Sequence, residues 1–454
     1  MKILLTIFPS LLFAQLEYSA DSLYLVDTGQ PVFLAGHSPW QISTNLTLNE
    51  AKRYADSCAT HDINLWIVSM HSPVDFGGLA NENGDLPWQG GTQNFTATPN
   101  EAYWSFIDSL VGYAKTKGIY VALYPIYLGN SSAQGIQNEV NAASLDDMYA
   151  WGQYVGARYA DSTNVFYMLG GDNDPTSWTD AIDTVAAGIL SQDTNHLIGT
   201  HDHRDSNSDT YWQGRSWLTL GNFYIGDAED AYIQAKYFRA RNPKIPSGML
   251  EGYYENEGTT DQYLRAISYY ATLGGALGYA LAGNCPIWHF GEYAGSPCDP
   301  DVDWAAHLDS QGMKNQKWFA RLFRSRYWYK LMPDTLQAVM TAGYGTFGNT
   351  TYVTTAYASD GSSIIAYLPA QGSGVTIDPS VLVGDSCRVY WFNPENGGVT
   401  AEDSEDTGNT FQVTPPESGD WVLVVDSENF DALFDIPGGS APLTQITYLP
   451  IRIN

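Results

Sequence analysis

The sequence is short of positive charge. It contains 21 lysines and arginines against 50 aspartates and glutamates, a formal net charge of −29. Binding to a phosphate backbone demands a basic face, and an anionic membrane surface attracts basic runs. No run of five basic residues occurs in the chain. The composition therefore argues against nucleic acid and anionic membranes as partners, and indicates an acidic, soluble protein.

Long apolar runs are also missing beyond the first residues. Lys2, the apolar stretch 3–13 and Ala14 have the order of an export signal with a small-residue cleavage site. The apolar stretch is too short to span a bilayer, which takes about 20 residues. We therefore expect residues 1–14 to be a signal peptide, and the mature protein to be secreted without membrane insertion.

Cysteine is scarce, with four in 454 residues. No CxxC spacing suggests a zinc site. Cys285 and Cys298 flank one loop, and a disulfide between them would suit an oxidising compartment. Cys58 and Cys387 resemble buried free thiols.

From residue 15 to about 335, strand-like apolar runs alternate with helix-length amphipathic segments. This alternation is typical of βαβ units. Eight strands are predicted, near 32–36, 64–70, 119–126, 165–170, 197–201, 218–225, 247–251 and 277–283. Helices are predicted over 48–61, 102–117, 145–160, 179–191, 231–241, 261–273 and 304–324. The pattern predicts an α/β fold, a (β/α)8 TIM barrel, with 203–217 as a loop over its mouth and a hairpin at its N-terminus.

The pattern changes near residue 335. Short alternating strands are predicted near 351–356, 363–368, 374–377, 386–392, 410–413 and 420–425, separated by turns such as Asp360-Gly361 and Asn396-Gly397. We expect residues 336–426 to form a small C-terminal antiparallel β-sandwich that supports the barrel through Trp391 and Trp421. The tail 427–454 has no clear pattern.

Two carboxylates follow strand-like runs. Asp172 ends the segment 169–172, Leu-Gly-Gly-Asp, and Glu251 directly follows the run 248–250. A β/α barrel assembles its active site from the C-terminal ends of its strands, and two facing carboxyl groups are what cleavage of a glycosidic bond requires. A helix cap for Asp172 and a surface ion pair for Glu251 are the alternatives. The paired glycines before Asp172 favour close approach of the backbone at a strand end instead.

Other side chains are expected at the same mouth. His37, His71 and Tyr124 lie at predicted strand ends, although each would also suit the core. Trp40, Trp88, Trp212 and Trp288 are candidate platforms for the apolar faces of sugars. Asn173, Asn222, Tyr254 and Glu255 complete the predicted substrate-binding set, with Glu255 as the competitor of Glu251 for the nucleophile.

His201-Asp202-His203 invites interpretation as a zinc site, since imidazoles and carboxylates bind zinc. The spacing occurs once, without a further histidine or cysteine cluster nearby, and we interpret His201 and His203 as hydrogen-bonding groups of a sugar site. No metal and no cofactor is predicted. A metal-dependent hydrolase using these histidines is the second enzymatic alternative.

Several segments resemble secreted glycoside hydrolases that join a barrel to a small sandwich labelled collagen-binding, whose characterised branch is glycoside hydrolase family 140. These segments are 31–40 (PVFLAGHSPW), 48–54 (LNEAKRY), 118–125 (GIYVALYP), 158–172 (ending in GGD), Ile287-Trp288, 393–398 (NPENGG) and 419–426 (GDWVLVVD). The departures fall at the mouth: His37 stands where the family usually has Asp, and Leu250-Glu251-Gly252 where it usually has Gly-Glu-Pro. The segments 203–217 and 281–286 also differ from the family pattern.

The resemblance implies that Asp172 is the acid/base, that Glu251 is the nucleophile, and that Tyr254 and Glu255 line the site. It also implies a carbohydrate substrate, with apiose linkages of the pectin rhamnogalacturonan-II as the best guess. A galacturonate could be received by Arg204, Arg215, His201 or His203. The expectation is a retaining glycosidase acting on a plant cell-wall polysaccharide. The alternative from another class is a non-catalytic glycan-binding surface protein on a degenerate barrel. The sequence gives no indication of the oligomeric state.

Overall fold

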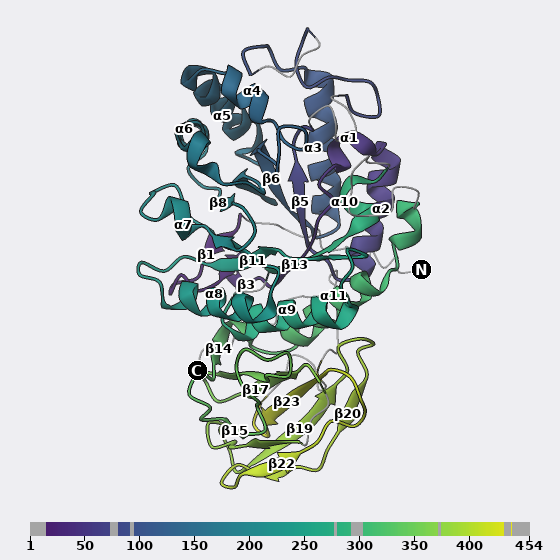
Figure 1. Cartoon of the computed structure of the whole chain (residues 1–454), viewed down its shortest axis with the longest axis vertical. Helices are drawn as coiled ribbons and strands as arrows, with labels where there is room; N and C mark the ends of the chain where they lie inside the picture. The colour runs from purple at the N-terminus through teal and green to yellow at the C-terminus, as the bar shows by residue number, and fades with distance from the viewer. Residues whose placement is uncertain are drawn as a thin grey trace, which may run out of the picture.

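The N-terminal part of the chain is a closed barrel of parallel strands in a computed structural model (Figure 1). The structure describes residues 15–72, 80–90, 95–276, 279–291, 303–370, 374–430 and 437. The barrel strands, in chain order, are β4 (Leu34–His37), β5 (Leu65–Ser69), β6 (Tyr120–Tyr127), β7 (Val165–Gly170), β8 (Ile198–His201), β10 (Gly221–Tyr224), β11 (Ser247–Glu251) and β13 (Tyr279–Asn284). Neighbours pair in parallel, β4 pairs with β13, and a bridge between Gly199 and Leu220 joins β8 to β10. The predicted TIM barrel is confirmed.

The barrel strands form where apolar residues are continuous, because both faces of the sheet are buried. Each observed strand lies within a few residues of its predicted range. Inward-facing side chains such as Leu34, Ile67 and Ala122 fill the barrel interior. A small antiparallel sheet of β1 (Glu17–Tyr18), β2 (Leu25–Asp27) and β3 (Gln30–Pro31) adds Leu16, Leu25 and Val32 to the same cluster.

Helices surround the barrel. The long ones are α2 (Leu48–Thr60), α3 (Glu101–Thr116), α5 (Leu145–Tyr159), α6 (Thr179–Leu190), α8 (Ala228–Ala240), α9 (Asp261–Leu273) and α11 (Gln311–Arg324), and the short ones are α1 (Ile42–Asn45), α4 (Gln137–Ala142), α7 (Asp209–Trp212) and α10 (Cys285–His289). Thr47 and Glu50 form the expected capping box of α2. The single helix predicted over 304–324 is wrong: a 3-10 turn, Trp304–His307, precedes α11, which starts anew after its cap Ser310.

Two antiparallel sheets follow the barrel. The larger contains β14 (Leu331–Pro333), β16 (Thr354–Ala358), β17 (Ser363–Leu368), β23 (Trp421–Ser427), β19 (Ser386–Phe392), β20 (Val399–Ala401) and β21 (Glu405–Asp406); the smaller contains β15 (Met340–Ala342), β18 (Val375–Ile377) and β22 (Phe411–Val413). Apolar side chains of both sheets form one core. The predicted sandwich is therefore confirmed.

The larger sheet lies against the barrel helices (Figure 1). Tyr269 of α9 stacks on Tyr367 of β17, with ring centroids 4.7 Å apart. Arg265 of α9 forms a buried pair with Asp420 (2.7 Å), and Arg326 a second with Asp426 of β23 (2.7 Å). The expected contact through Trp391 and Trp421 is wrong, because both indoles pack between the two sheets. Alternation along a strand sends neighbouring side chains to opposite faces, and Tyr390 and Phe392 are the ones that meet the barrel side.

Several sequence predictions fall outside the described residues, among them the signal peptide 1–14, Cys298, and all of the tail beyond residue 430 except residue 437. Cys285 is disulfide-bonded. Cys58 and Cys387 are buried free thiols, as predicted. Among the helices of the described ranges, none combines the length and the apolar character needed to cross a bilayer.

Candidate active site

Asp172 lies just beyond the C-terminal end of β7, in a left-handed backbone conformation. Gly170, Gly171 and Asp172 have successive φ values of 85°, 133° and 50°. A Cβ atom on Gly171 would lie 2.2 Å from the Tyr127 ring, and one on Gly170 would lie 2.7 Å from the carbonyl oxygen of His201. Only glycine tolerates such crowding together with a positive φ. The paired glycines thus let the chain turn sharply beneath Tyr127 and present Asp172 at the barrel mouth.

Glu251 ends β11 and is buried, with 6% of its surface exposed. The Tyr254 hydroxyl donates a hydrogen bond to its Oε1. His201, from the end of β8, places Nε2 2.9 Å from Oε2, but out of line for a hydrogen bond. The Trp40 indole donates to the Tyr254 hydroxyl at 2.9 Å. Three side chains from different strand ends or their loops, Trp40, His201 and Tyr254, therefore surround one carboxylate.

The two carboxyl groups sense each other electrostatically. Burial, and then the negative charge of Glu251, raise the pKa of Asp172 to about 7, while His201 and Arg204 oppose the shift. An uncharged carboxyl beside a neighbouring carboxylate is the arrangement in which one group can serve as an acid. The predicted pair is therefore brought together at one mouth.

Aromatic and amide side chains surround this pair. Burial, with the charges of both Asp172 and Glu251, raises the pKa values of Tyr127 and Tyr224 well above the ordinary range, so both phenols flank the pair. Tyr124 is buried, with its ring against Trp40 and His201, and Trp288 packs against the same cluster. Asn173, next to Asp172, donates to the Gly129 carbonyl. Asn222 is buried and lines a small hollow with His201 and Tyr224.

Arg204 and Glu257 form the rim on one side of the mouth. The Arg204 guanidinium lies 4.5 Å from the centre of the Tyr253 ring and 5.4 Å from that of Tyr224. It lies 3.8 Å from a carboxylate oxygen of Glu257, and Glu257 also accepts a hydrogen bond from the Tyr254 backbone. Sequence reasoning missed Tyr127, Tyr224 and Glu257. The position of the two tyrosines at strand ends could have revealed them, whereas Glu257 lies in a loop without a signal.

Two histidines predicted at the mouth face elsewhere, which corrects the sequence interpretation. His37 Nδ1 lies 2.6 Å from the Tyr54 hydroxyl of α2, in the layer between strands and helices. Burial lowers the pKa of His37 to about 3. His71 is enclosed by Trp88, Phe95, Trp104 and Trp151. Both histidines are core residues of the outer layer.

Glu255 is also directed away from the mouth. It accepts hydrogen bonds from Asn284 Nδ2 (2.7 Å), Ser310 Oγ (2.7 Å) and the Gly312 backbone (2.9 Å). Ser310 and Gly312 stand at the start of α11, where free N–H groups attract a carboxylate. Glu255 anchors this helix, and its expected roles as substrate ligand or competing nucleophile are wrong.

The other side chains predicted at the mouth contact different parts of the protein. Trp88 and Trp212 are buried indoles and offer no sugar platform; Trp212 donates to Asp202. His203 contacts Tyr211, with Nε2 and the hydroxyl 2.9 Å apart, and Arg215 pairs with Asp183 at 3.1 Å. His201 and His203 thus point to different partners. Within the described ranges, no group of three or more histidine, cysteine or acidic side chains is placed to hold a metal.

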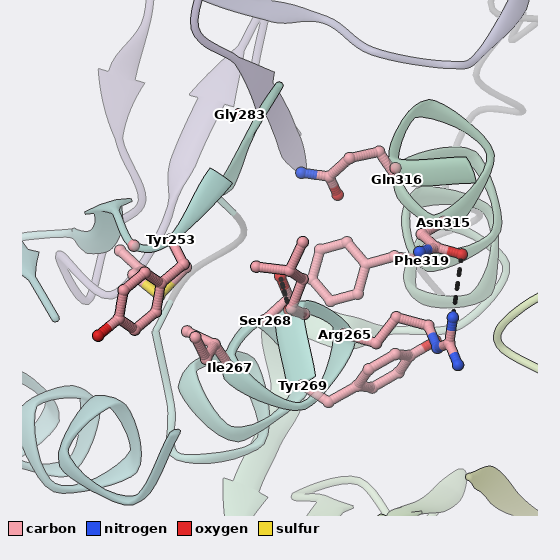
Figure 2. A pocket seen from close by; sticks show the side chains of 13 residues that line it. Tyr253, Arg265, Ile267, Ser268, Tyr269, Gly283, Asn315, Gln316 and Phe319 are labelled. Atoms are coloured by element: carbon pink, nitrogen blue, oxygen red, sulfur yellow. Dashed lines mark hydrogen bonds between the residues drawn. The ribbon is translucent and has the colours of Figure 1, made fainter. Parts of the chain in front are cut away.

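One pocket lies behind the site, not in it. It has a volume of about 490 Å³ between β11, α9 and α11, and Tyr253, Ser268, Gln316 and Phe319 are among its lining residues (Figure 2). Neither Asp172 nor Glu251 contributes to its wall. The chemistry therefore belongs to the barrel mouth.

Comparison with known proteins finds matches to both parts of the chain. Residues 19–330 match the family model "Apiosidase-like, catalytic domain", and residues 343–426 match "Putative collagen-binding domain of a collagenase". A crystal structure of a glycoside hydrolase family 5 protein from Bacteroides vulgatus aligns with a TM-score of 0.80 at 21% identity, covering 92% of this chain and 94% of that one. A structure named "Glycoside hydrolase" gives 0.81 at 21% identity, covering 92% and 98%. No curated protein matches the sequence.

Proposed function

The chain belongs to the apiosidase-like family, and from this premise we propose that it is a retaining glycoside hydrolase with Asp172 as acid/base and Glu251 as nucleophile. The observation that carries the proposal is the raised pKa of Asp172. Burial, and then the charge of Glu251, raise this pKa to about 7. A retaining glycosidase needs one carboxyl group that is protonated when it acts as the acid.

In the first step, a Glu251 oxygen attacks the anomeric carbon while Asp172 transfers its proton to the glycosidic oxygen. The leaving alcohol departs and a glycosyl ester forms on Glu251. In the second step, Asp172 takes a proton from water, and the water oxygen displaces Glu251 from the anomeric carbon. Tyr254 donates to Glu251 Oε1, which holds that oxygen in place while the other is available for attack.

The substrate that we propose is a side chain of pectin, cleaved at an apiose linkage. The family description supports this choice, and Arg204 supplies a cation at the rim for an acidic sugar. With a formal charge of −29, the protein repels an anionic polymer at long range. Screening confines that repulsion to about 8 Å at physiological salt. An acidic sugar that reaches the mouth can therefore still pair with Arg204.

The test is to incubate the protein with pectic and hemicellulosic oligosaccharides, and to follow the released sugar by NMR during the first turnovers. We expect hydrolysis of apiose-containing pectic fragments, with the anomer of the first product matching that of the substrate. Inversion of the anomer would contradict the retaining mechanism. Hydrolysis of neutral hemicellulose alone would contradict the substrate.

Export is part of the same proposal, because polymeric pectin lies outside the producing cell. Residues 1–14 carry the motivating pattern. N-terminal sequencing of protein from the culture medium or periplasm should find a start just after Ala14, and recovery of the intact chain from the cytoplasm alone would refute export.

A further inference from the structure

Trp40 stands at the centre of the groups that hold Glu251. It follows β4 and is buried, with 3% of its surface exposed. A sugar platform must offer its ring face to solvent, as a stacked sugar replaces water there. The Trp40 ring instead faces protein on its sides, against His201, Tyr124 and Tyr127. Trp40 must therefore act on the protein and not on the substrate.

The first contact of Trp40 fixes the direction of a hydrogen bond. An indole N–H is a donor only, so the Tyr254 hydroxyl oxygen must accept from Trp40 Nε1, at 2.9 Å. A tyrosine hydroxyl carries one proton. With its oxygen already accepting from Trp40, that proton is directed to Glu251 Oε1. The order Trp40, Tyr254, Glu251 is thereby a one-way chain of donors.

The second contact acts on the other oxygen of the same carboxylate. The Trp40 and His201 rings are stacked, with centroids 5.6 Å apart and planes 16° from parallel. Tyr124 and Tyr224 press against the same imidazole, at 6.0 and 5.3 Å. The imidazole is buried and its Nε2 stands 2.9 Å from Glu251 Oε2. One indole thus contacts a neighbour of each oxygen of Glu251: the hydroxyl that donates to Oε1, and the closely packed imidazole beside Oε2.

We propose that Trp40 is a positioning residue that orients the Glu251 carboxylate through two arms, the hydroxyl of Tyr254 and the ring of His201. The inference rests on the proposed role of Glu251 as nucleophile. Holding the attacking group in a near-attack orientation contributes to the rate of the chemical step and leaves substrate affinity unchanged. Loss of Trp40 contacts should consequently lower kcat, with little change in KM.

The first test does not depend on turnover. In a ¹⁵N-labelled protein, the Trp40 indole N–H resonance is assigned by its loss in W40F. In Y254F the indole loses its acceptor, and we expect that resonance to move upfield, while the other indole resonances stay in place. A Trp40 resonance that keeps its position in Y254F would overturn the first arm.

The second test is a double-mutant cycle on kcat, with rhamnogalacturonan-II side-chain oligosaccharides as substrate. W40F keeps an aromatic face for His201 but removes the N–H donor. If Trp40 acts through Tyr254, W40F and Y254F each lower kcat about 10-fold or more, and the double variant resembles Y254F alone. Replacing the ring as well, in W40L, should cost several-fold more than W40F, because the His201 arm is also lost.

W178F is the matched control. Trp178 also donates an indole hydrogen bond, to Asn141 Oδ1 at 2.9 Å, but lies outside the site. We expect wild-type kcat and KM for W178F, and a folded thermal transition for every variant. Independent, multiplying effects of W40F and Y254F, or a rise in KM without a fall in kcat, would overturn the role of Trp40. Absence of turnover in the wild-type protein would refute the proposed function instead, and the indole spectrum would still decide the Trp40–Tyr254 linkage.

Discussion

The negative charge of Glu251 helps to hold the pKa of Asp172 at about 7, with burial of Asp172 as the larger cause. In the proposed mechanism the two groups act in the same step: Asp172 gives its proton to the glycosidic oxygen while Glu251 attacks the anomeric carbon. A change in either residue should therefore be visible in the other.

The E251Q variant should lower the pKa of Asp172. The amide removes the charge at position 251 but leaves Asp172 as buried as before. The pKa of Asp172 should therefore fall part of the way towards 3.8, the ordinary value for aspartate. ¹³C NMR of the Asp172 carboxyl across pH measures this directly. D174N serves as the control, since Asp174 is an exposed cap whose acceptor role is towards Thr176. An unchanged or higher value in E251Q would show that the two carboxyl groups do not interact.

Activity should decline as pH rises through about 7. The first step needs Asp172 protonated, and above its pKa the protonated fraction drops tenfold for each further pH unit. The measurement is kcat/KM from pH 4 to 9 with a pectic oligosaccharide. A profile that stays level to pH 9 would remove Asp172 from the role of acid.

The D172N variant should lose activity according to the quality of the leaving group. With a sugar alcohol as leaving group we expect a fall of at least about 100-fold, because general acid catalysis contributes roughly 10²–10⁴. An activated aryl glycoside needs little protonation, so its glycosylation rate should fall much less. Equal losses on both substrates would indicate a damaged site. If the wild-type protein also shows no turnover, and D172N binds the glycan as tightly as the wild-type protein does, the glycan-binding alternative would be favoured.

The R204Q variant should lose selectivity for acidic substrates. Arg204 stacks on Tyr253 and lies 3.8 Å from a Glu257 oxygen, beyond hydrogen-bond distance, so its guanidinium has donors to offer a ligand. We expect the ratio of kcat/KM for a galacturonate-containing oligosaccharide to that for its methyl ester to fall about tenfold or more. R215Q is the control, since Arg215 pairs with Asp183. Equal ratios in R204Q and the wild-type protein would exclude Arg204 from recognition of the acidic sugar.

The R265M variant should destabilise the whole chain. It leaves Asp420 buried without its cation, and loss of one partner of a buried pair costs about 3–5 kcal/mol of the free energy of unfolding. Arg158 also pairs with two carboxylates, Glu101 and Asp108, but these are exposed, so R158M should cost no more than about 1 kcal/mol. Urea unfolding at fixed pH compares the two. Similar small losses would show that the Arg265 pair is solvated.

The barrel could be predicted because its strands repeat one physical pattern, a short apolar run that ends in polar residues. The positions of Asp172 and Glu251 at strand ends could be predicted for the same reason. His37 was misplaced although alternation along β4 could have corrected it: Leu34 faces the interior, so the odd-numbered His37 faces the helices. Glu255 could not be placed, because its direction is set by the start of α11, about 55 residues further along the chain.

The contact between the larger sheet and α9 limits how far the chain can be shortened. Tyr269 and Tyr367, and the paired charges beside them, are covered only while both halves of the chain are present. If the barrel and the sandwich were expressed separately, each would expose an apolar surface and a charged side chain without its partner. We expect both fragments to aggregate. Exchange of the sandwich for that of a relative would require the matching residues of α9 to be exchanged with it.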